Sequence, residues 1–382
     1  MRMLVLGAGQ QGSACAYDLL THSDAEVVLA DRELPGRLPS FLAAFQDTRL
    51  KLVRVDADDP GSVDRVMEGA DATLCALPYY LNLPMMEAAI AAGSHFCDLG
   101  GNTEIVLRQK KRSAQARERG VSAVADCGLA PGMVNILAEK GIRSLDRVRS
   151  VRILVGGLPQ RPEPPLGYQV VYSLEGVIDY YTSLSWVLRE GRLQRREALS
   201  EVEELEFPGA GRLEAFHTAG GLSLMAQRYE GVVESMEYKT LRYPGHAMVM
   251  RVIRDLGLFD REPVEVGGVR VAPRDLFLAV AGPRLRRDPA ESPDLVAMRV
   301  EVTGEKGGEE RTLRWDLLDH YDPRTGITAM MRTTGFSLAI TALLQVEGAV
   351  APGVWTADEA IPADPYVAAL RERGIEVRQT SA

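Results

Sequence analysis

The chain has 382 residues, of which 46% are hydrophobic and 25% charged, and its formal net charge is −9. This length accommodates two or three domains of ordinary globular composition. The acidic balance argues against a nucleic-acid partner, and the lack of any 18-residue apolar run argues against a membrane-spanning helix.

The four cysteines are scattered without C-x-x-C spacing, and the five histidines lie far apart in the sequence. This usage predicts free thiols in a reducing cytoplasm and no metal site. Because a predicted strand begins almost at the N-terminus, we expect no signal peptide.

The first predicted element is the apolar strand Met3–Leu6, which leads into a glycine-rich turn and then an apolar helical pattern. The turn has the spacing G-x-G-x-x-G, and its expected cofactor-binding residues are Gly7, Gly9, Gln10, Gln11 and Gly12. Such a turn between a strand and a helix lets the backbone approach a pyrophosphate at the helix N-terminus. It predicts a dinucleotide site; the alternative is a glycine-rich turn that binds nothing.

The second predicted strand, Glu26–Ala30, ends at Asp31, nineteen residues after Gly12. An acid at this distance binds the adenosine ribose hydroxyls of NAD and repels the 2′-phosphate of NADP. Arg32 weakens the inference, because an arginine could pair with that phosphate. We therefore expect NAD, with NADP as the less favoured cofactor.

Four more strands are predicted before residue 126, with helical segments between them. They are Leu50–Val55, Ala72–Ala76, His95–Asp98 and Val121–Ala125. This alternation predicts an α/β class and a doubly wound parallel sheet of the Rossmann type, with ligands bound at the carboxyl ends of the strands. The cofactor-binding candidates that follow these strands are Asp56, Ala57, Leu77, Pro78 and Asp98, and the Tyr79 hydroxyl is placed where it could reach a substrate.

After Asp126 the pattern becomes mixed, which predicts an inserted α+β domain. Its expected elements include a helix from Pro131 to Lys140, a strand Val148–Gly156 and helices at Ala247–Leu256 and Arg274–Leu285. A glycine-rich turn at residues 304–308 predicts a hairpin.

Further along, an apolar helix at Gly335–Leu344 is expected to pack back on the first domain, with Trp355–Val377 as a lid or clamp. The predicted domains are residues 1–128, 129–325 and 326–382.

Several motifs together resemble the saccharopine dehydrogenase and lysine 6-dehydrogenase family. They are Gly7–Gly12, Gly128-Leu-Ala-Pro-Gly132, Gly156-Gly-Leu-Pro159 with Pro164-Pro-Leu-Gly-Tyr168, Leu241-Arg-Tyr-Pro-Gly-His246 and Arg332-Thr-Thr-Gly-Phe336. Ala130 stands where saccharopine-forming members tend to carry an acid, so the sequence is most similar to the lysine 6-dehydrogenases.

The resemblance implies oxidation of the ε-amine of L-lysine by NAD, yielding 2-aminoadipate 6-semialdehyde, which cyclises, and ammonia. A free lysine amine titrates near ~10.4, so such a site needs a base or must bind the neutral amine. A guanidinium fork suits the α-carboxylate.

The candidates for proton handling are Asp126, His246 and Tyr79. The candidate substrate-binding residues are Arg242, Arg332, Thr333, Gly156, Gly157 and Tyr172. For each there is a structural alternative: a capping carboxylate, a histidine bonded to backbone, an interdomain ion pair, a turn or simple packing.

Three other functions stay open: a saccharopine reductase, a related carboxyalkylamine dehydrogenase acting on polyamine precursors, and a dinucleotide-binding sensor without catalysis. The resemblance also implies a small-molecule substrate bound by the inserted α+β domain, and a homodimer formed through that substrate and dimerisation domain.

Overall fold

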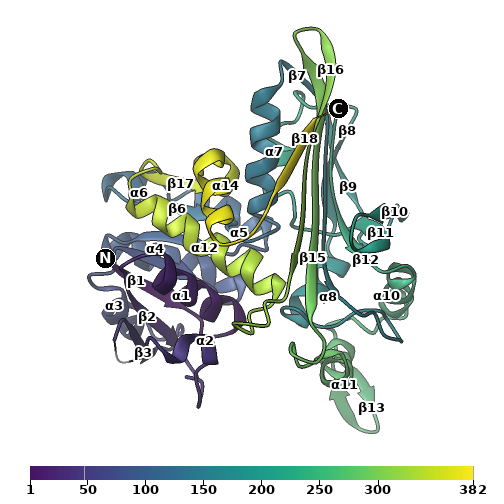
Figure 1. Cartoon of the computed structure of the whole chain (residues 1–382). Coiled ribbons are helices and arrows are strands. Elements are labelled where there is room, and N and C mark those ends of the chain that lie inside the picture. Colours follow the sequence, from purple (N-terminus) through teal and green to yellow (C-terminus); the bar gives the residue numbers. More distant parts are fainter. Residues whose placement is uncertain (47, 382) are drawn as a thin grey trace.

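Two β-sheets organise the molecule in this computed structural model, which describes residues 1–46 and 48–381. Figure 1 shows a first unit, in which helices surround a twisted sheet, beside a second unit built on a long upright sheet. No helix in these two ranges is both long and apolar enough to cross a membrane.

The first sheet has seven parallel strands in the order β17-β6-β5-β4-β1-β2-β3. Its strands are β1 Arg2–Leu6, β2 Glu26–Asp31, β3 Leu50–Arg54, β4 Ala72–Cys75, β5 His95–Asp98, β6 Ser122–Ala125 and β17 Gly353–Thr356. The order reverses between β1 and β4, as in a Rossmann fold, and this reversal is where such sheets bind ligands. The Rossmann-type fold class predicted from the sequence is therefore confirmed.

The helices of this unit cover both faces of the sheet (Figure 1). They are α1 Gln10–His22, α2 Ser40–Ala43, α3 Pro60–Met67, the 3-10 turn η1 Tyr79–Leu81, α4 Asn82–Ala92, α5 Thr103–Lys110 and α6 Ser113–Glu118.

The second sheet has a continuous path β10-β11-β12-β7-β15-β16-β18, with β8 and β9 attached beside β12. Its strands are β7 Arg147–Pro159, β8 Ser185–Arg189, β9 Arg192–Arg196, β10 Glu203–Phe207, β11 Gly211–His217, β12 Ser235–Arg242, β15 Asp294–Lys306, β16 Glu309–His320 and β18 Arg378–Ser381. The predicted hairpin forms at Gly307 and Gly308, whose φ angles of 61° and 83° suit glycine.

The remaining elements flank the second sheet or return to the first. They are α7 Met133–Ser144, α8 Leu174–Thr182, α9 Met225–Arg228, α10 His246–Asp255, β13 Val264–Val266, β14 Val269–Val271, α11 Pro273–Leu285, α12 Ala329–Val346, α13 Ala357–Ala360 and α14 Ala363–Glu372.

Two predicted boundaries in the second unit were wrong. The helix expected at Pro131 begins at Met133, because Gly132 caps it with a φ of 135° and its N–H donates to the Asn135 side chain at 2.7 Å. The strand expected to end at Gly156 continues to Pro159, because β15 pairs along its whole length.

The lid predicted at Trp355–Val377 is also corrected. Within it β17 pairs in parallel with β6 and forms the edge of the first sheet, while α14 packs against α12 and α7. The apolar helix α12 packs on α1, as expected. This segment therefore completes the Rossmann unit and does not line the cavity described below.

Candidate active site

A cavity of about 430 Å³ lies between the two sheets, at the carboxyl ends of β4, β5 and β6. The first unit contributes Gln11 and residues 76–80, 99–101 and 128–131. The opposite wall comes from the second sheet, α8 and α12. The cavity thus occupies the place that parallel α/β sheets use for their ligands.

The glycine-rich turn has the geometry that a dinucleotide requires. Gly7 has a φ of 100°, and a Cβ on Gly12 would lie 1.8 Å from the Gly7 carbonyl oxygen. A Cβ on Gly9 would meet nothing within 4 Å, so its backbone faces open space. Since α1 also begins without a side-chain cap, its first N–H groups are available to a pyrophosphate.

Asp31 links this turn to the end of β2. Its Oδ2 accepts from the N–H of Ala8 at 2.7 Å and its Oδ1 from that of Glu33 at 3.0 Å. Each carboxylate oxygen keeps a further lone pair for a ribose hydroxyl. Arg32, Asp56 and Ala57 lie beside it, at the ends of β2 and β3, and the Arg32 and Asp56 side chains are exposed.

Gln11 lines the cavity with a side-chain amide that makes no hydrogen bond to the described residues. Neither its Nε2 nor its Oε1 has a hydrogen-bond partner within the described residues, although both atoms are shielded from solvent. Leu77, Pro78 and Tyr79 line the same wall, as expected from their position after β4. Gln10 is exposed at the first turn of α1.

Arg242 is a buried cation in the opposite wall of the cavity. Alternate residues of β12 face the cavity, namely Tyr238, Thr240 and Arg242. The guanidinium is almost fully buried, donates to the Leu241 carbonyl at 2.8 Å and lies 4.9 Å from the centre of the Tyr168 ring. Its Nε lacks a partner, and among residues 1–46 and 48–381 no carboxylate forms an ion pair with it. Because a buried charge needs compensation, this arginine is suited to binding an anion in the cavity.

One face of α8 forms the rim of the cavity through Glu175, Gly176, Asp179 and Tyr180. Its other face is buried in an apolar cluster, which fixes this orientation. Asp179 pairs with Arg261 at 2.9 Å and with Arg274 at 2.7 Å, and lies 3.5 Å from the Tyr79 hydroxyl. Burial and the Asp179 charge raise the pKa of Tyr79.

A second cavity of about 460 Å³ adjoins the first and shares Tyr79, Asp179 and Arg261 with it. Its other walls include Asn102, Thr182 and Trp186. The two cavities together offer room for a ligand longer than a single amino acid.

Tyr172 and Gly157 also line the main cavity. A Cβ on Gly157 would lie 2.4 Å from Met330 Cε, and one on Gly156 would lie 2.6 Å from the Leu241 carbonyl oxygen. Both glycines sit within the β7–β15 ladder, so they admit close packing and form no strand-end turn.

Asp126 lies behind the cavity wall and not in it. Its backbone has a φ of 61°, and its Oδ2 accepts a hydrogen bond from Ser223 of the other unit. A Cβ on Gly100 would collide with Oδ1, so the carboxyl is packed beneath the Gly100 backbone. Burial, aided by the charge of Asp98, raises the pKa of Asp126 to about 8. This placement does not support direct contact with substrate.

Among the groups that the structure describes, the Asp98 carboxyl forms hydrogen bonds only to those of the first unit. It accepts from the Gly100 N–H at 2.8 Å and from Gln109 at 2.7 Å, and it is fully buried. Burial raises the pKa of Asp98 to about 6. The carboxyl shapes the loop after β5, and it does not line the cavity.

His246 begins α10 inside an aromatic cluster. Its Nε2 lies 2.9 Å from the Tyr181 hydroxyl, and its ring stacks on Phe216. Burial and the nearby Arg242 lower the pKa of His246 to about 3, so it stays neutral at neutral pH. The geometry supports a role in packing behind Tyr168 and does not support proton transfer.

Arg332 and Thr333 are turned away from the cavity. Arg332 pairs with Asp319 at 2.8 Å and donates to the carbonyls of Arg373 and Gly374. Thr333 is buried and donates to the Ala329 carbonyl at 2.8 Å. The neighbouring Thr334 faces the cavity instead. The geometry therefore places one candidate carboxylate binder, Arg242, at the cavity and the other in an ion pair.

Sequence reasoning missed Asp179, Tyr180, Tyr238, Thr240 and Arg261. The alternation Tyr238-x-Thr240-x-Arg242 was a usable signal, because one face of a strand carries all three side chains. Nothing local marks Asp179 or Arg261, which come together only through the tertiary fold.

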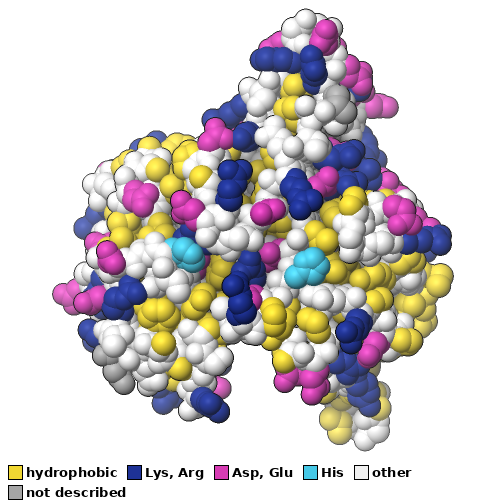
Figure 2. Space-filling view, in the orientation of Figure 1, with side chains coloured by type: hydrophobic (Ala, Val, Ile, Leu, Met, Phe, Trp, Pro, Cys, Tyr) yellow, Lys and Arg dark blue, Asp and Glu magenta, His cyan; other side chains and the backbone are white. Residues whose placement is uncertain are grey.

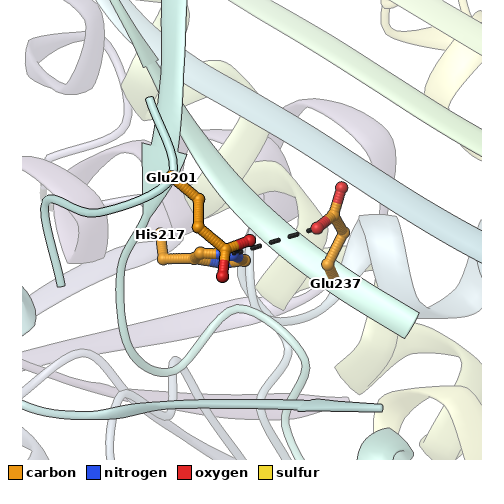
Figure 3. Close-up of side chains that lie close together, drawn as sticks. All are labelled: Glu201, His217 and Glu237. Atoms are coloured by element: carbon orange, nitrogen blue, oxygen red, sulfur yellow. Dashed lines mark hydrogen bonds and ion pairs between the residues drawn. The ribbon is translucent and has the colours of Figure 1, made fainter. Parts of the chain in front are cut away.

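Among residues 1–46 and 48–381, one group has side chains close enough to hold a metal ion, namely Glu201, His217 and Glu237 (Figure 3). Arg189 already pairs with both glutamates, and Arg196 pairs with Glu201 at 2.7 Å. These cations neutralise the carboxylates, so the geometry describes an ion-pair network.

The fold and cavity together define a two-unit, dinucleotide-binding protein whose ligand lies between the units. Two family models match the chain: the saccharopine dehydrogenase NADP binding domain over residues 3–126 and the saccharopine dehydrogenase C-terminal domain over residues 128–375. The chain therefore belongs to the saccharopine dehydrogenase family of oxidoreductases, and its first domain is the pyridine-nucleotide-binding domain of that family.

Curated relatives agree with this membership. A saccharopine dehydrogenase [NADP(+), L-glutamate-forming] of Schizosaccharomyces pombe is 24% identical over 69% of this chain, which spans 59% of that protein. A carboxyaminopropylagmatine dehydrogenase of Synechocystis sp. is 22% identical over 98% of this chain and 96% of its own length.

Among solved structures, the apo saccharopine dehydrogenase (L-Glu forming) of Saccharomyces cerevisiae superposes with a TM-score of 0.80. The match covers 100% of this chain and 99% of that one at 18% identity, which establishes a shared fold.

Proposed function

We propose that the protein oxidises the ε-amine of L-lysine to an imine with NAD, and that water then hydrolyses the imine to 2-aminoadipate 6-semialdehyde and ammonia. The observation that carries the proposal is the buried, unpaired Arg242 guanidinium, which faces the cavity opposite the cofactor wall. A substrate carboxylate supplies the missing counter-charge, and the guanidinium fork fixes its orientation.

The Gly7–Gly12 turn would hold the cofactor, and Leu77 and Gln11 would border its nicotinamide, which would supply the hydride acceptor. Gln11 offers an amide with unused donor and acceptor atoms at this wall. Arg242 holds the carboxylate at the far wall, so the two walls together set which substrate carbon faces the cofactor.

The amine must lose a proton before hydride transfer, since the nitrogen lone pair drives the reaction. Of the three candidate proton acceptors, Tyr79 alone lines the cavity. Its hydroxyl is close to Asp179, which offers an acceptor beside it at 3.5 Å. We assign proton handling to this Tyr79–Asp179 pair.

A second candidate substrate is a secondary amine that carries a carboxyalkyl group. The adjoining 460 Å³ cavity, which shares Tyr79 and Asp179, has room for the longer substituent. The nearly full-length match to a carboxyaminopropylagmatine dehydrogenase supports this candidate.

A panel of amines assayed for NADH or NADPH formation, with ammonia measured alongside, separates these functions. Lysine deamination gives one ammonia per reduced cofactor, whereas oxidation of a secondary amine gives none and releases a second amine. A chain that binds the cofactor but reduces it with no amine would be a sensor, and that result would refute the proposal.

Cofactor choice provides a separate test. Asp31→Ala is expected to weaken NAD use by roughly tenfold or more, because hydrogen bonds to a charged group contribute about 1.5–3 kcal/mol. The variant should use NADP relatively better, and adding Arg32→Ala should remove that gain. Equal use of NADP and NAD by the wild type would contradict our interpretation of Asp31.

The buried Asp126 predicts a pH dependence of stability. Its pKa rises from the unfolded value of 3.8 to about 8, so between these values the folded state keeps a proton that the unfolded state has lost. The free energy of unfolding should therefore fall as pH rises from about 4 to 8, by at most about 1.4 kcal/mol per pH unit from this group.

Asp126→Asn should flatten this slope, as measured by urea unfolding at pH 5, 6, 7 and 8, while changing kcat little. An unchanged slope would show that Asp126 is ionised in the folded protein. A loss of kcat by 100-fold with the fold intact would instead restore Asp126 as the catalytic base.

A further inference from the structure

The Arg242 guanidinium can bind a carboxylate only if its fork is turned toward the cavity. Lysine and arginine side chains stand at the surface of the face shown in Figure 2, whereas Arg242 is only 3% exposed. Its Nη1 donates to the Leu241 carbonyl at 2.8 Å, and its Nε has no partner among the described residues. One short backbone bond does not fix the plane of a guanidinium, so other contacts must orient it.

Two tyrosines flank this guanidinium. The Tyr168 ring centre lies 4.9 Å from it, within the range of a cation–π interaction. Burial raises the pKa of Tyr181, and the charge of Arg242 and a hydrogen bond to that side chain oppose the rise. Because a guanidinium has donors and no acceptor, the Tyr181 oxygen accepts this bond.

The Tyr181 hydroxyl is held in turn by His246. Its oxygen lies 2.9 Å from Nε2, and each side chain is only 1% exposed. His246 is neutral at neutral pH, so one of its ring nitrogens accepts and the other donates. Among residues 1–46 and 48–381 the hydroxyl has no other acceptor, so its hydrogen points to Nε2. The imidazole proton therefore lies on Nδ1.

The imidazole of His246 is itself held in place by its neighbours. The Phe216 ring stacks on it, with the ring centres 6.2 Å apart and the planes within 9°. The Glu214 carboxylate accepts from the N–H groups of Gly245 at 2.8 Å and Ala247 at 2.6 Å, the residues on either side of the histidine. These contacts fix both the ring and its backbone, so Nε2 is a rigid acceptor for the tyrosine hydroxyl.

We propose that Tyr181 and His246 are positioning residues, which turn the Arg242 guanidinium toward the substrate carboxylate through two successive hydrogen bonds. Neither side chain lines the cavity among the residues that the structure describes, so neither contacts the reacting atoms. The carboxylate is that of the proposed substrate, so this role rests on the proposed function, whereas the order of the two bonds does not.

Steady-state kinetics test the positioning role. Tyr181→Phe removes the hydroxyl and keeps the ring, and we expect it to raise KM for lysine roughly tenfold, because a free guanidinium must be ordered when the substrate binds. Since the carboxylate is held in the ground state and the transition state alike, kcat should change little. The kcat/KM for cadaverine, which has no carboxylate, should not change.

Two substitutions of His246 test the second bond. His246→Leu removes the acceptor and should raise KM for lysine as Tyr181→Phe does. His246→Gln should restore most of the wild-type KM, because its amide oxygen can accept from the hydroxyl in place of Nε2. A merely structural histidine would not show this selective recovery.

Tyr243→Phe is the matched control, since it removes a hydroxyl from the residue next to Arg242. That hydroxyl donates to the Pro159 carbonyl at 2.9 Å, and KM for lysine should not change without it. A wild type that prefers lysine to cadaverine, together with Tyr181→Phe and His246→Leu variants that keep the wild-type KM, would overturn the positioning role. Equal losses with both amines would overturn it as well.

A measurement without substrate separates this proposal from the proposed function. Nitrogen-15 NMR of the full chain with labelled histidine, assigned through His246→Gln, reports which ring nitrogen carries the proton. We expect a neutral ring protonated on Nδ1 at pH 7, and a shifted Nε2 resonance in Tyr181→Phe. A ring protonated on Nε2, or an unshifted resonance, would overturn the proposal even if lysine is oxidised. A wild type that does not oxidise lysine would refute the proposed function instead, and the position of the proton would then decide the order of bonds by itself.

Discussion

Arg242→Met is expected to lower kcat/KM for lysine by roughly 10²–10³-fold, mainly through KM. Truncating one member of a buried, hydrogen-bonded charge pair costs about 2–5 kcal/mol, and in the proposed site the substrate carboxylate would be the other member. Because the contact exists in both the ground state and the transition state, kcat should fall much less. Steady-state kinetics at saturating cofactor measure both effects.

Arg242→Lys should recover only part of the loss, since one ammonium cannot reproduce the planar fork. Arg332→Lys is the matched control, because Arg332 is engaged by Asp319 away from the cavity. Its KM should stay within a few-fold of wild type. A large rise in KM for Arg332→Lys together with an unchanged KM for Arg242→Met would show that Arg332, and not Arg242, binds the substrate carboxylate.

Among the predicted substitutions, loss of the Arg373–Asp18 ion pair should lower the free energy of unfolding the most. Arg373 Nε lies 2.7 and 2.9 Å from the two Asp18 oxygens, and both side chains are almost fully buried. This pair holds the segment after α14 against α1, the helix that begins at the glycine-rich turn. Arg373→Met removes the guanidinium and leaves the buried Asp18 carboxylate beside His22, which should cost about 3–5 kcal/mol.

Urea unfolding of three variants measures this effect. The double variant Asp18→Leu/Arg373→Leu should regain most of the lost stability, because a buried ion pair often adds little over an apolar pair. Lys306→Ala removes an exposed pair with Asp146 and should cost under about 1 kcal/mol. Equal losses for Arg373→Met and Lys306→Ala would show that the buried pair does not secure the C-terminal segment.

The first sheet was predictable because its signals are local. The strand Met3–Leu6 is a short apolar run, and the glycine spacing of Gly7–Gly12 is readable directly. β17 escaped detection because it lies outside the run of alternating strands and helices and joins β6 from more than 200 residues further along the chain. Only the assembled sheet shows that it is a strand.

The site was predictable only in part, because side-chain direction is a tertiary property. Arg242 was a candidate, and the alternation of β12 turns it toward the cavity. Asp126 follows a strand as a catalytic acid would, yet its φ of 61° and the contact with Ser223 bury it. His246 is held behind Tyr181 in the same way. No local pattern distinguishes these outcomes.

The central claim is that a lysine-like amine is oxidised while Arg242 holds its carboxylate. The most direct test compares kcat/KM for lysine and for cadaverine, which lacks only the carboxylate, in wild type and in Arg242→Met. Our account predicts that the wild type prefers lysine by roughly 10²–10³-fold and that the variant loses this preference. A wild type that oxidises both amines equally well, or a variant that keeps the preference, would contradict it.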